Sequence, residues 1–419
     1  MYTLFAKWFR NLSIGKIGNM REYELQEKTL DVSGLTISYT DTGPADGPLV
    51  FCVHGLLSTG RDFDFLAKAL AQRGYRCIAI TLPGRGKSGR FMHYMQYVPP
   101  NYVPYCLAVL EHEAPGQEFS WLGVSLGGIL GMMLHSTLGR HQQYNVVRLG
   151  QWMFGHSSVP VAANLHDFSS KESVQQFSSN LSKLSDLMTS VPDGLKRLRQ
   201  FPGQDYVPVD EVMDSASGDS GAQEDAHGSA SMPVSVMSMP QSTVQMTRLI
   251  IIDVGGEIPA ESMDLIGEIA HLPIVYESKD EAVNGLKKRC AGWGIEQDDH
   301  WNHMIEHSIV AREDGTFAFH YDEGVGRIQA IKNEALPLWH LWAGLEQPTL
   351  LVRGGKSRIL PEDVARKMHE RYTGEQMDEI VFEACGHVPN LMQDDHIDPV
   401  IRWLEKTETR QAEDIVLAG

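Results

Sequence analysis

The sequence predicts an α/β protein with a mostly parallel sheet and helices on both of its faces. The main observation is that short apolar, strand-like runs alternate along the chain with longer helix-like stretches. The composition is that of a globular protein, with 42% hydrophobic and 21% charged residues among 419. A wholly disordered, collagen-like or disulfide-scaffold chain is therefore excluded.

The expected elements follow in chain order. An antiparallel hairpin is expected at the sheet edge, at 23–30 and 35–41. Further strands are expected at 48–53, 75–80, 119–124, 247–252, 348–353 and 378–383. Helices are expected at 62–73, 126–138, 361–373 and 396–406.

Changes in composition divide the chain into segments. The expected segments are a basic extension (1–22), a first part of the core (23–142), an insert (143–246), a core strand with its following loop (247–257), a helical cap (258–345), a second part of the core (346–407) and a tail (408–419). The cap is placed over the carboxyl ends of the strands, where open α/β sheets bind ligands.

The insert 143–246 has a different texture from the core. Residues 214–245 are rich in Ser, Gly, Asp and Met without apolar periodicity, and we expect them to be disordered. One amphipathic helix is expected around 174–188, from the spacing of its apolar residues. Such a helix docks either on the chain's own core or on a protein partner.

Charge and cysteine content limit the partners and the compartment. The formal net charge of −18 repels phosphate backbones, so no nucleic-acid partner is expected. Five scattered cysteines form neither a disulfide framework nor a zinc motif, and Cys52 and Cys77 are expected to be buried thiols. We therefore expect a cytoplasmic protein. The alternative is a mitochondrial one, because the first 21 residues carry four basic and no acidic side chains.

A membrane-spanning segment is not expected. Residues 119–139 carry no Asp, Glu, Lys or Arg, as a transmembrane helix would. The segment holds five glycines, however, and a G-x-S-x-G motif divides it into a strand and a helix.

Residues 123–127 form that motif, Gly-Val-Ser-Leu-Gly. A sharp strand-to-helix turn presents the hydroxyl of its central residue, Ser125, as a nucleophile. The backbone N–H of Leu126 then points toward the space above Ser125 and is expected to bind an oxyanion. The loop after an earlier strand, His54-Gly55-Leu56, is expected to supply the Leu56 N–H as a second donor.

A general base must accept the serine proton at neutral pH. His387, in Cys-Gly-His-Val-Pro after the last expected strand, lies in the chain order that Ser…acid…His hydrolases use.

These motifs together resemble the α/β-hydrolase family. The His-Gly-Leu loop, the Pro83–Ser88 loop, the elbow around Ser125 and the turn at His387 match the family in order, over about 28–142 and 246–407. The short local sequences around these motifs are similar to those of a bacterial-type subgroup of capped hydrolases and esterases. A long insert is not part of that pattern. The resemblance implies a small-molecule acyl substrate and no cofactor.

The acid is the point where the sequence departs from many family members. The loop after the strand ending near 353 holds no carboxylate where one is often found, and Arg358 is cationic. Asp253 closes the preceding strand, and we predict that it orients His387. The alternative is that Asp253 caps the following turn.

Other candidate site residues follow from position alone. Arg61 and His54, beside the oxyanion loop, and Trp301 and Tyr321, in the cap, are candidates for substrate contact. The favoured alternative for Arg61 is that it caps, with Asp62, the helix beginning near 62.

Two further patterns are rejected. Gly84–Ser88 resembles part of a P-loop, but its first glycine would fall on Thr81. His303–His307 matches H-x-x-E-H, but no third ligand is identifiable from the sequence, so no metal is expected.

The sequence therefore predicts a serine hydrolase acting on an ester or thioester. A carbon–carbon bond hydrolase with the same triad is the nearest enzymatic alternative. A hydrolase-fold binding or scaffold protein, with a partner on the insert, is the alternative from another class.

Overall fold

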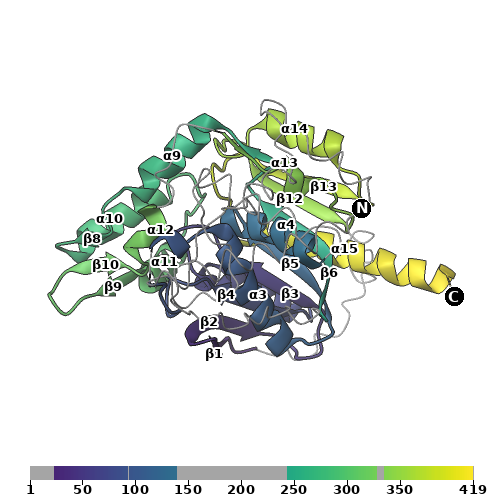
Figure 1. The fold of residues 1–419 in the computed structure, drawn as a ribbon, viewed down its shortest axis with the longest axis horizontal. Coiled ribbons are helices and arrows are strands. Elements are labelled where there is room, and N and C mark those ends of the chain that lie inside the picture. Colours follow the sequence, from purple (N-terminus) through teal and green to yellow (C-terminus); the bar gives the residue numbers. More distant parts are fainter. Residues whose placement is uncertain (1–22, 93, 139–242, 328–334, 419) are drawn as a thin grey trace, which may run out of the picture.

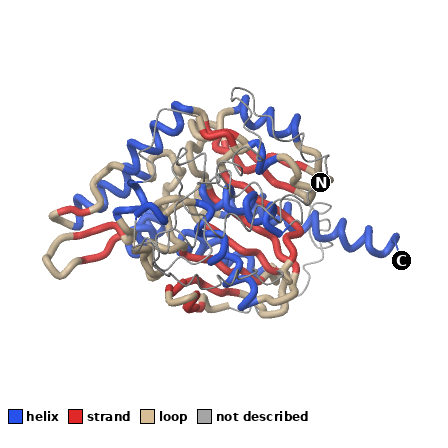
Figure 2. The backbone as a smooth tube through the Cα atoms, in the orientation of Figure 1, coloured by secondary structure: helices blue, strands red, loops and turns tan. Residues whose placement is uncertain are grey.

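The centre of the molecule is an eight-stranded sheet in the order β1-β2-β4-β3-β5-β6-β12-β13 (Figures 1 and 2). The computed structural model describes residues 23–92, 94–138, 243–327 and 335–418. From one edge to the other, the strands are β1 (Gln26–Val32), β2 (Leu35–Thr42), β4 (Arg76–Thr81), β3 (Leu49–Val53), β5 (Glu118–Val124), β6 (Gln245–Ile252), β12 (Thr349–Gly354) and β13 (Met377–Phe382). The six strands from β4 to β13 pair in parallel, and the β1–β2 hairpin joins β4 antiparallel. The predicted fold class is confirmed.

Helices cover both faces of the sheet. They are α2 (Asp64–Gln72), α3 (Pro99–Glu113), α4 (Leu126–Leu138), α14 (Glu362–Arg371) and α15 (Asp394–Ala418). Alternate residues of β3 show the division: Val50 and Cys52 pack in the core with α2 and α15, whereas Phe51 packs in the core with α3, α4 and α14. Because both faces are covered, the central strands are continuous apolar runs.

The sequence prediction missed α3, the 15-residue helix Pro99–Glu113. Its first two residues are proline, and Pro104 lies inside it. Proline reads as a break in a pattern, but it fits the first helical turn, where the backbone N–H has no helical acceptor.

A second group of elements lies between β6 and β12. They are β7 (Glu257–Ile258), α9 (Ala260–Ala270), β8 (Val275–Tyr276), α10 (Lys279–Arg289), α11 (Asp298–Ser308), β9 (Ile309–Ala311), β10 (Phe317–Phe319), α12 (Glu323–Arg327), β11 (Leu336–Pro337) and α13 (Trp339–Trp342). In Figure 1, α9 to α12 and the small sheet β8-β10-β9 form a lobe beside the main sheet. We propose that this segment acts as the expected cap.

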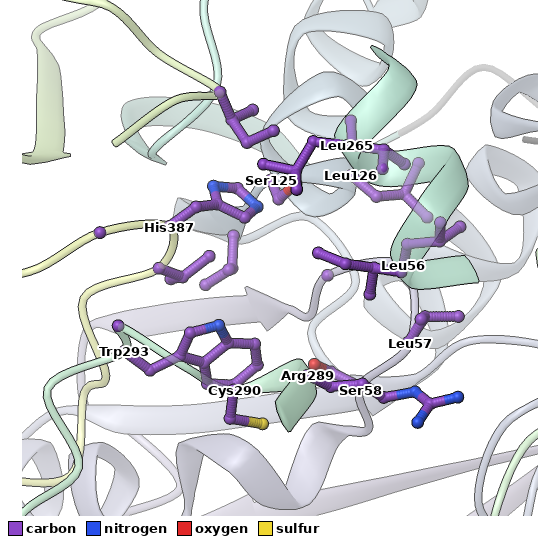
Figure 3. A pocket seen from close by; sticks show the side chains of 18 of the residues that line it. Leu56, Leu57, Ser58, Ser125, Leu126, Leu265, Arg289, Cys290, Trp293 and His387 are labelled. Carbon is purple, nitrogen blue, oxygen red and sulfur yellow. The ribbon is translucent and has the colours of Figure 1, made fainter. Parts of the chain in front are cut away.

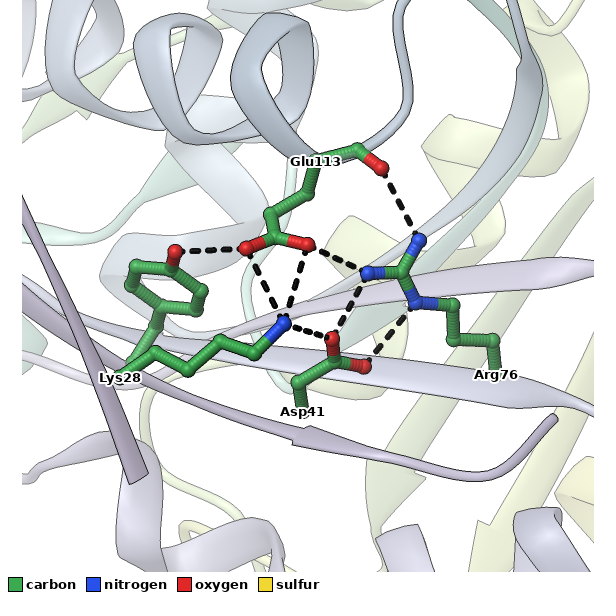
Figure 4. A network of polar contacts seen from close by, with 5 residues as sticks. Lys28, Asp41, Arg76 and Glu113 are labelled. Atoms are coloured by element: carbon green, nitrogen blue, oxygen red, sulfur yellow. Dashed lines mark hydrogen bonds and ion pairs between the residues drawn. The ribbon is translucent and has the colours of Figure 1, made fainter. Parts of the chain in front are cut away.

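A polar network fastens the edge hairpin to the sheet and to α3 (Figure 4). Arg76 Nη2 donates to Asp41 at 2.7 Å and to Glu113 at 2.5 Å, and Lys28 Nζ donates to Asp41 at 2.7 Å. The Arg76 and Asp41 side chains are only 8% and 10% exposed. Burial opposes ionisation of Asp41, but hydrogen bonds from Arg76 and Lys28 outweigh it and lower the pKa of that carboxyl.

Three predicted features lie wholly or almost wholly outside the described residues. They are the basic extension, the amphipathic helix around 174–188 and the low-complexity tract 214–245, of which the structure describes only the last three residues. Cys52 and Cys77 are buried free thiols, as predicted. None of the helices in the described part of the chain combines the length and apolar character that crossing a bilayer requires.

Candidate active site

Ser125 lies in a strained turn between β5 and α4. Its φ of +48° is in the left-handed region, which non-glycine residues rarely adopt. Two glycines allow the turn: a Cβ at Gly123 would lie 2.2 Å from the Gly127 carbonyl oxygen, and one at Gly127 would lie 2.0 Å from the Val53 oxygen. The Ser125 N–H donates to the Ile252 carbonyl at 2.8 Å, which ties the turn to β6.

Asp253 follows β6 directly and also has a positive φ, +56°. Its side chain is fully buried. Oδ1 accepts a 3.0 Å hydrogen bond from the Gly354 N–H, and Oδ2 accepts a 2.6 Å bond from the Ser357 hydroxyl. The loop after β12, which carries no acid, therefore holds the acid that the neighbouring strand supplies.

His387 lies in the loop after β13 and reaches Asp253. Its Nδ1 lies 2.5 Å from Asp253 Oδ2, and the imidazole is 22% exposed. Because an ionised carboxylate only accepts, Nδ1 carries the proton of a neutral ring and Nε2 is left with a free lone pair. Ser125 and His387 line the same cavity (Figure 3).

The two backbone donors expected to bind an oxyanion are also at this cavity. Leu56 and Leu126 both line it (Figure 3). Within the described part of the chain, the N–H of neither residue donates to another group. Leu126 is the first residue of α4, so its N–H lies at the positive end of the helix.

His54 and Arg85 hold the loop that carries Leu56. The His54 Nδ1 lies 2.6 Å from the Gly55 oxygen, and its Nε2 accepts from the Leu82 N–H at 3.0 Å. Burial, and secondly the charge of Arg85, lower the pKa of His54 to about 3, so the ring is neutral. Arg85 donates from Nε and Nη2 to the Leu56 oxygen at 3.0 and 2.9 Å. Both His54 ring nitrogens are engaged with backbone, and neither is left for a substrate.

The cavity has a volume of about 770 Å³ and mostly apolar walls. The cap supplies much of the apolar lining from α9, notably Met263, Ile266 and Ile269. Three exposed cations also line it, and none of them forms an ion pair within the residues described: Lys288, Lys356 and Arg358.

Asp62 is a carboxyl at this cavity. It lies in the 3₁₀ helix η1 (Gly60–Phe63), after the Leu56 loop. Burial, with a smaller contribution from Asp64, raises the pKa of Asp62 to about 7 even though the Ser58 hydroxyl bonds to it. Asp62 can therefore change charge near neutral pH.

Arg61 does not line the cavity. Its guanidinium binds Asp64 through Nε and Nη2, at 2.8 and 2.6 Å to Oδ2, and also contacts Glu27. Arg61 was a candidate for substrate contact because it is close in sequence to the oxyanion loop. In the structure, Asp64 and Glu27 bind the guanidinium instead.

Trp301 and Tyr321 are also absent from the cavity lining among the described residues. The Trp301 Nε1–H donates to the Ile295 oxygen at 3.2 Å. The Tyr321 ring stacks on Phe319, with centroids 5.9 Å apart. Both aromatic side chains pack within the cap, and their orientation depends on contacts that the sequence pattern does not show.

Sequence reasoning missed Ser357 and the apolar wall from α9. It named Asp62, together with Arg61, beside the oxyanion loop, but it did not predict a buried carboxyl at the cavity. A serine in a loop is common, so Ser357 gave no signal. The apolar residues of α9 have helical spacing, which could have identified a helix with a buried face.

Comparison with known proteins agrees with this fold. Residues 50–241 match the model of the alpha/beta hydrolase family. The 3-hydroxybutyrate-oligomer hydrolase of Cupriavidus necator is 21% identical over 367 residues, covering 85% of this chain and 88% of the relative.

Two solved structures illustrate the similarity of fold. A putative hydrolase from Rickettsia typhi superposes with a TM-score of 0.60 at 20% identity, over 91% of this chain and 99% of that one. The thioesterase domain from the curacin biosynthetic pathway gives 0.52 at 16% identity, over 92% and 99%. Together with the eight-stranded sheet, these findings show that the chain belongs to the alpha/beta hydrolase family.

Proposed function

We propose that this hydrolase cleaves a carboxylic ester through an acyl-enzyme, with Ser125 as nucleophile, His387 as base and Asp253 as orienting acid. The observation that carries the proposal is the hydrogen bond between His387 Nδ1 and the buried carboxylate of Asp253. That bond fixes the tautomer in which Nε2 can accept the serine proton.

In the first step the Ser125 oxygen attacks the ester carbonyl while His387 Nε2 takes the hydroxyl proton. The carbonyl oxygen becomes an oxyanion, which the N–H groups of Leu56 and Leu126 stabilise. Each such donor contributes about 3–4 kcal/mol to stabilising the transition state. The intermediate then collapses, and His387 returns the proton to the departing alcohol.

In the second step water attacks the acyl-enzyme. His387 removes a proton from the water and later returns it to Ser125, so the enzyme is regenerated. Asp253 remains ionised throughout and stabilises the imidazolium that forms twice in each cycle.

A more specific candidate substrate is a short oligoester of a hydroxy acid, which has a free carboxylate at one end. The Cupriavidus necator relative carries such a name and aligns over most of both chains. Three exposed cations of this mostly apolar cavity, Lys288, Lys356 and Arg358, have no ion-pair partner among the described residues and fit a substrate with an apolar backbone and one anionic end.

A thioester and a diketone-like acid remain the alternatives. The thioesterase domain with a similar fold has that activity by its name. A carbon–carbon bond hydrolase would use the same three residues, so only turnover of different substrates separates these reactions.

The test is turnover of a short nitrophenyl ester by the wild type and by Ser125→Ala. We expect Ser125→Ala to reduce kcat by at least about 10⁴-fold while the protein stays folded. Ser308→Ala is the matched control, because Ser308 also lines the cavity but lies on the cap helix α11.

A fluorophosphonate probe should label Ser125, as located by mass spectrometry, and a panel of hydroxybutyrate oligomers, acyl thioesters and diketone acids then ranks the substrates. Full activity of Ser125→Ala would contradict the proposal. Absence of labelling together with absence of turnover would favour the binding or scaffold protein.

A further inference from the structure

Two histidines of the cap and one aspartate of the core meet at the side of α11. His303 and His307 are one helical turn apart, and Asp64 is the first residue of α2. One ligand atom from each of the three side chains lies within 4.8 Å of the other two. Asp64 is the third ligand that the sequence did not identify, because it comes from a distant part of the chain.

The geometry is close to that of a divalent-metal site. His303 Nε2 and Asp64 Oδ2 are 3.7 Å apart. Two ligands on a tetrahedral zinc ion, each bonded at about 2.0–2.1 Å, are separated by roughly 3.4 Å. The His303–Asp64 pair is therefore close to that separation, and the His307 atom, within 4.8 Å of both, must move inward to reach bonding distance.

The three side chains are largely shielded from solvent. The Asp64 side chain is 4% exposed and that of His303 is 15% exposed. His307 is partly buried, and its ring centroid lies 4.5 Å from that of His303.

Arg61 is the cation that now neutralises Asp64. Its guanidinium contacts Asp64 Oδ2 at 2.6 Å and also contacts Glu27. Because Glu27 provides a second carboxylate, Arg61 can leave Asp64 without losing every anionic partner. The His303 Nε2–H donates to the Arg61 carbonyl oxygen at 2.9 Å, so that proton must move to Nδ1 when Nε2 binds a metal.

We propose that Asp64, His303 and His307 form a binding site for a divalent transition-metal ion, with zinc as the best-fitting ion, in exchange for the Arg61–Asp64 ion pair. Two imidazoles and one carboxylate are ligands that zinc accepts, with a fourth position for water. The site joins the cap to the core.

Binding would have a consequence for the cavity. Met304 and Ser308 follow His303 and His307 directly on α11, and both line the cavity. A metal that holds α11 against α2 therefore fixes one wall of the cavity. We expect zinc to raise the melting temperature by at least about 3 °C when it is in large excess over its Kd.

The experiment is calorimetric titration of the whole chain with zinc alone, and titration with cobalt(II), whose visible absorption reports four-coordinate binding to histidine. We expect one tight site that Asp64→Asn, His303→Ala and His307→Ala each weaken at least tenfold. Arg61→Gln should bind zinc more tightly than the wild type, because the competing cation is removed. A misfolded variant could not produce that gain.

Two controls separate this site from other histidines. His369→Ala removes a histidine that pairs with Glu379 at 3.1 Å, and His387→Ala removes the proposed base. Both variants should keep the tight site. Binding that survives in His303→Ala and His307→Ala would overturn the proposal, as would loss of binding in His387→Ala or an unchanged affinity in Arg61→Gln.

Discussion

The Ser357 hydroxyl donates a 2.6 Å hydrogen bond to Asp253 Oδ2, the same oxygen that His387 Nδ1 approaches at 2.5 Å. Ser357 lies in the loop after β12, where the resemblance to the family leads one to expect an acid and this sequence has none. The Ser357 O–H and the Gly354 N–H together hold the carboxylate in a fixed orientation. Ser357 therefore acts on the proposed chemistry through Asp253 rather than by touching substrate.

We predict that Ser357→Ala lowers kcat about tenfold, with little change in KM. The variant loses one hydrogen bond to a charged group, which contributes about 1.5 kcal/mol. Asp253→Asn should lower kcat far more, by about 10⁴-fold, because it favours the wrong tautomer of His387. Steady-state kinetics on one ester measures both. Equal losses in the two variants would contradict the separate roles given to them.

We predict that Asp62→Asn stabilises the protein above neutral pH. Burial raises the pKa of Asp62 from 3.8 to about 7, so the folded state binds this proton more tightly than the unfolded state does. Ionisation of Asp62 therefore lowers the stability of the wild type as the pH rises from about 4 to 7. The Asp62→Asn variant has no such ionisation and no such loss. Discounted for partial exposure, the gain at pH 8 is about 1–2 kcal/mol.

Urea unfolding at pH 4.5, 6 and 8 measures this difference. Asp46→Asn is the matched control, because Asp46 is exposed in a loop. A gain for Asp62→Asn that is the same at all three pH values would show that the effect does not come from ionisation.

We predict that Arg76→Met destabilises the fold by about 3–5 kcal/mol at pH 7. The change leaves Asp41 and Glu113, both largely buried, with Lys28 as their remaining cation in the network of Figure 4. Arg312→Met is the control, because the Arg312–Asp314 pair is about half exposed and should change stability by less than about 1 kcal/mol.

The destabilisation should depend on pH in a defined direction. The pKa values of Asp41 and Glu113 are lowered from 3.8 and 4.5, so their contribution is complete above about pH 4.5 and is lost as the pH falls through the lowered values. The difference between the wild type and Arg76→Met should therefore shrink below pH 4. A difference that is constant from pH 7 to pH 3 would contradict this account.

Much of the fold could be predicted from the sequence because its signals are local. The parallel strands are continuous apolar runs, and the predicted bounds of β3 and β12 differ from the observed ones by one residue. Ser125 was identifiable because its strained turn requires glycines at 123 and 127, which close backbone contacts explain.

The remainder depends on contacts between distant segments. Asp64 and His303 come together only when the cap lies against the core, and no spacing along the chain reports that. Ser357 meets Asp253 because β12 pairs with β6, a pairing that neither segment shows by itself. Arg61 binds the carboxylates of Asp64 and Glu27, and the sequence does not indicate which carboxylates lie within its reach.

The sheet order also bears on when activity can arise during synthesis. The proposed nucleophile Ser125 follows β5, whereas its proposed base His387 follows β13, the strand at the far edge of the sheet. At ribosomal speeds the histidine is translated roughly 10–50 s after the serine. A nascent chain would therefore carry an exposed but unactivated hydroxyl, and would be unable to attack cellular esters until its last strand has joined the sheet.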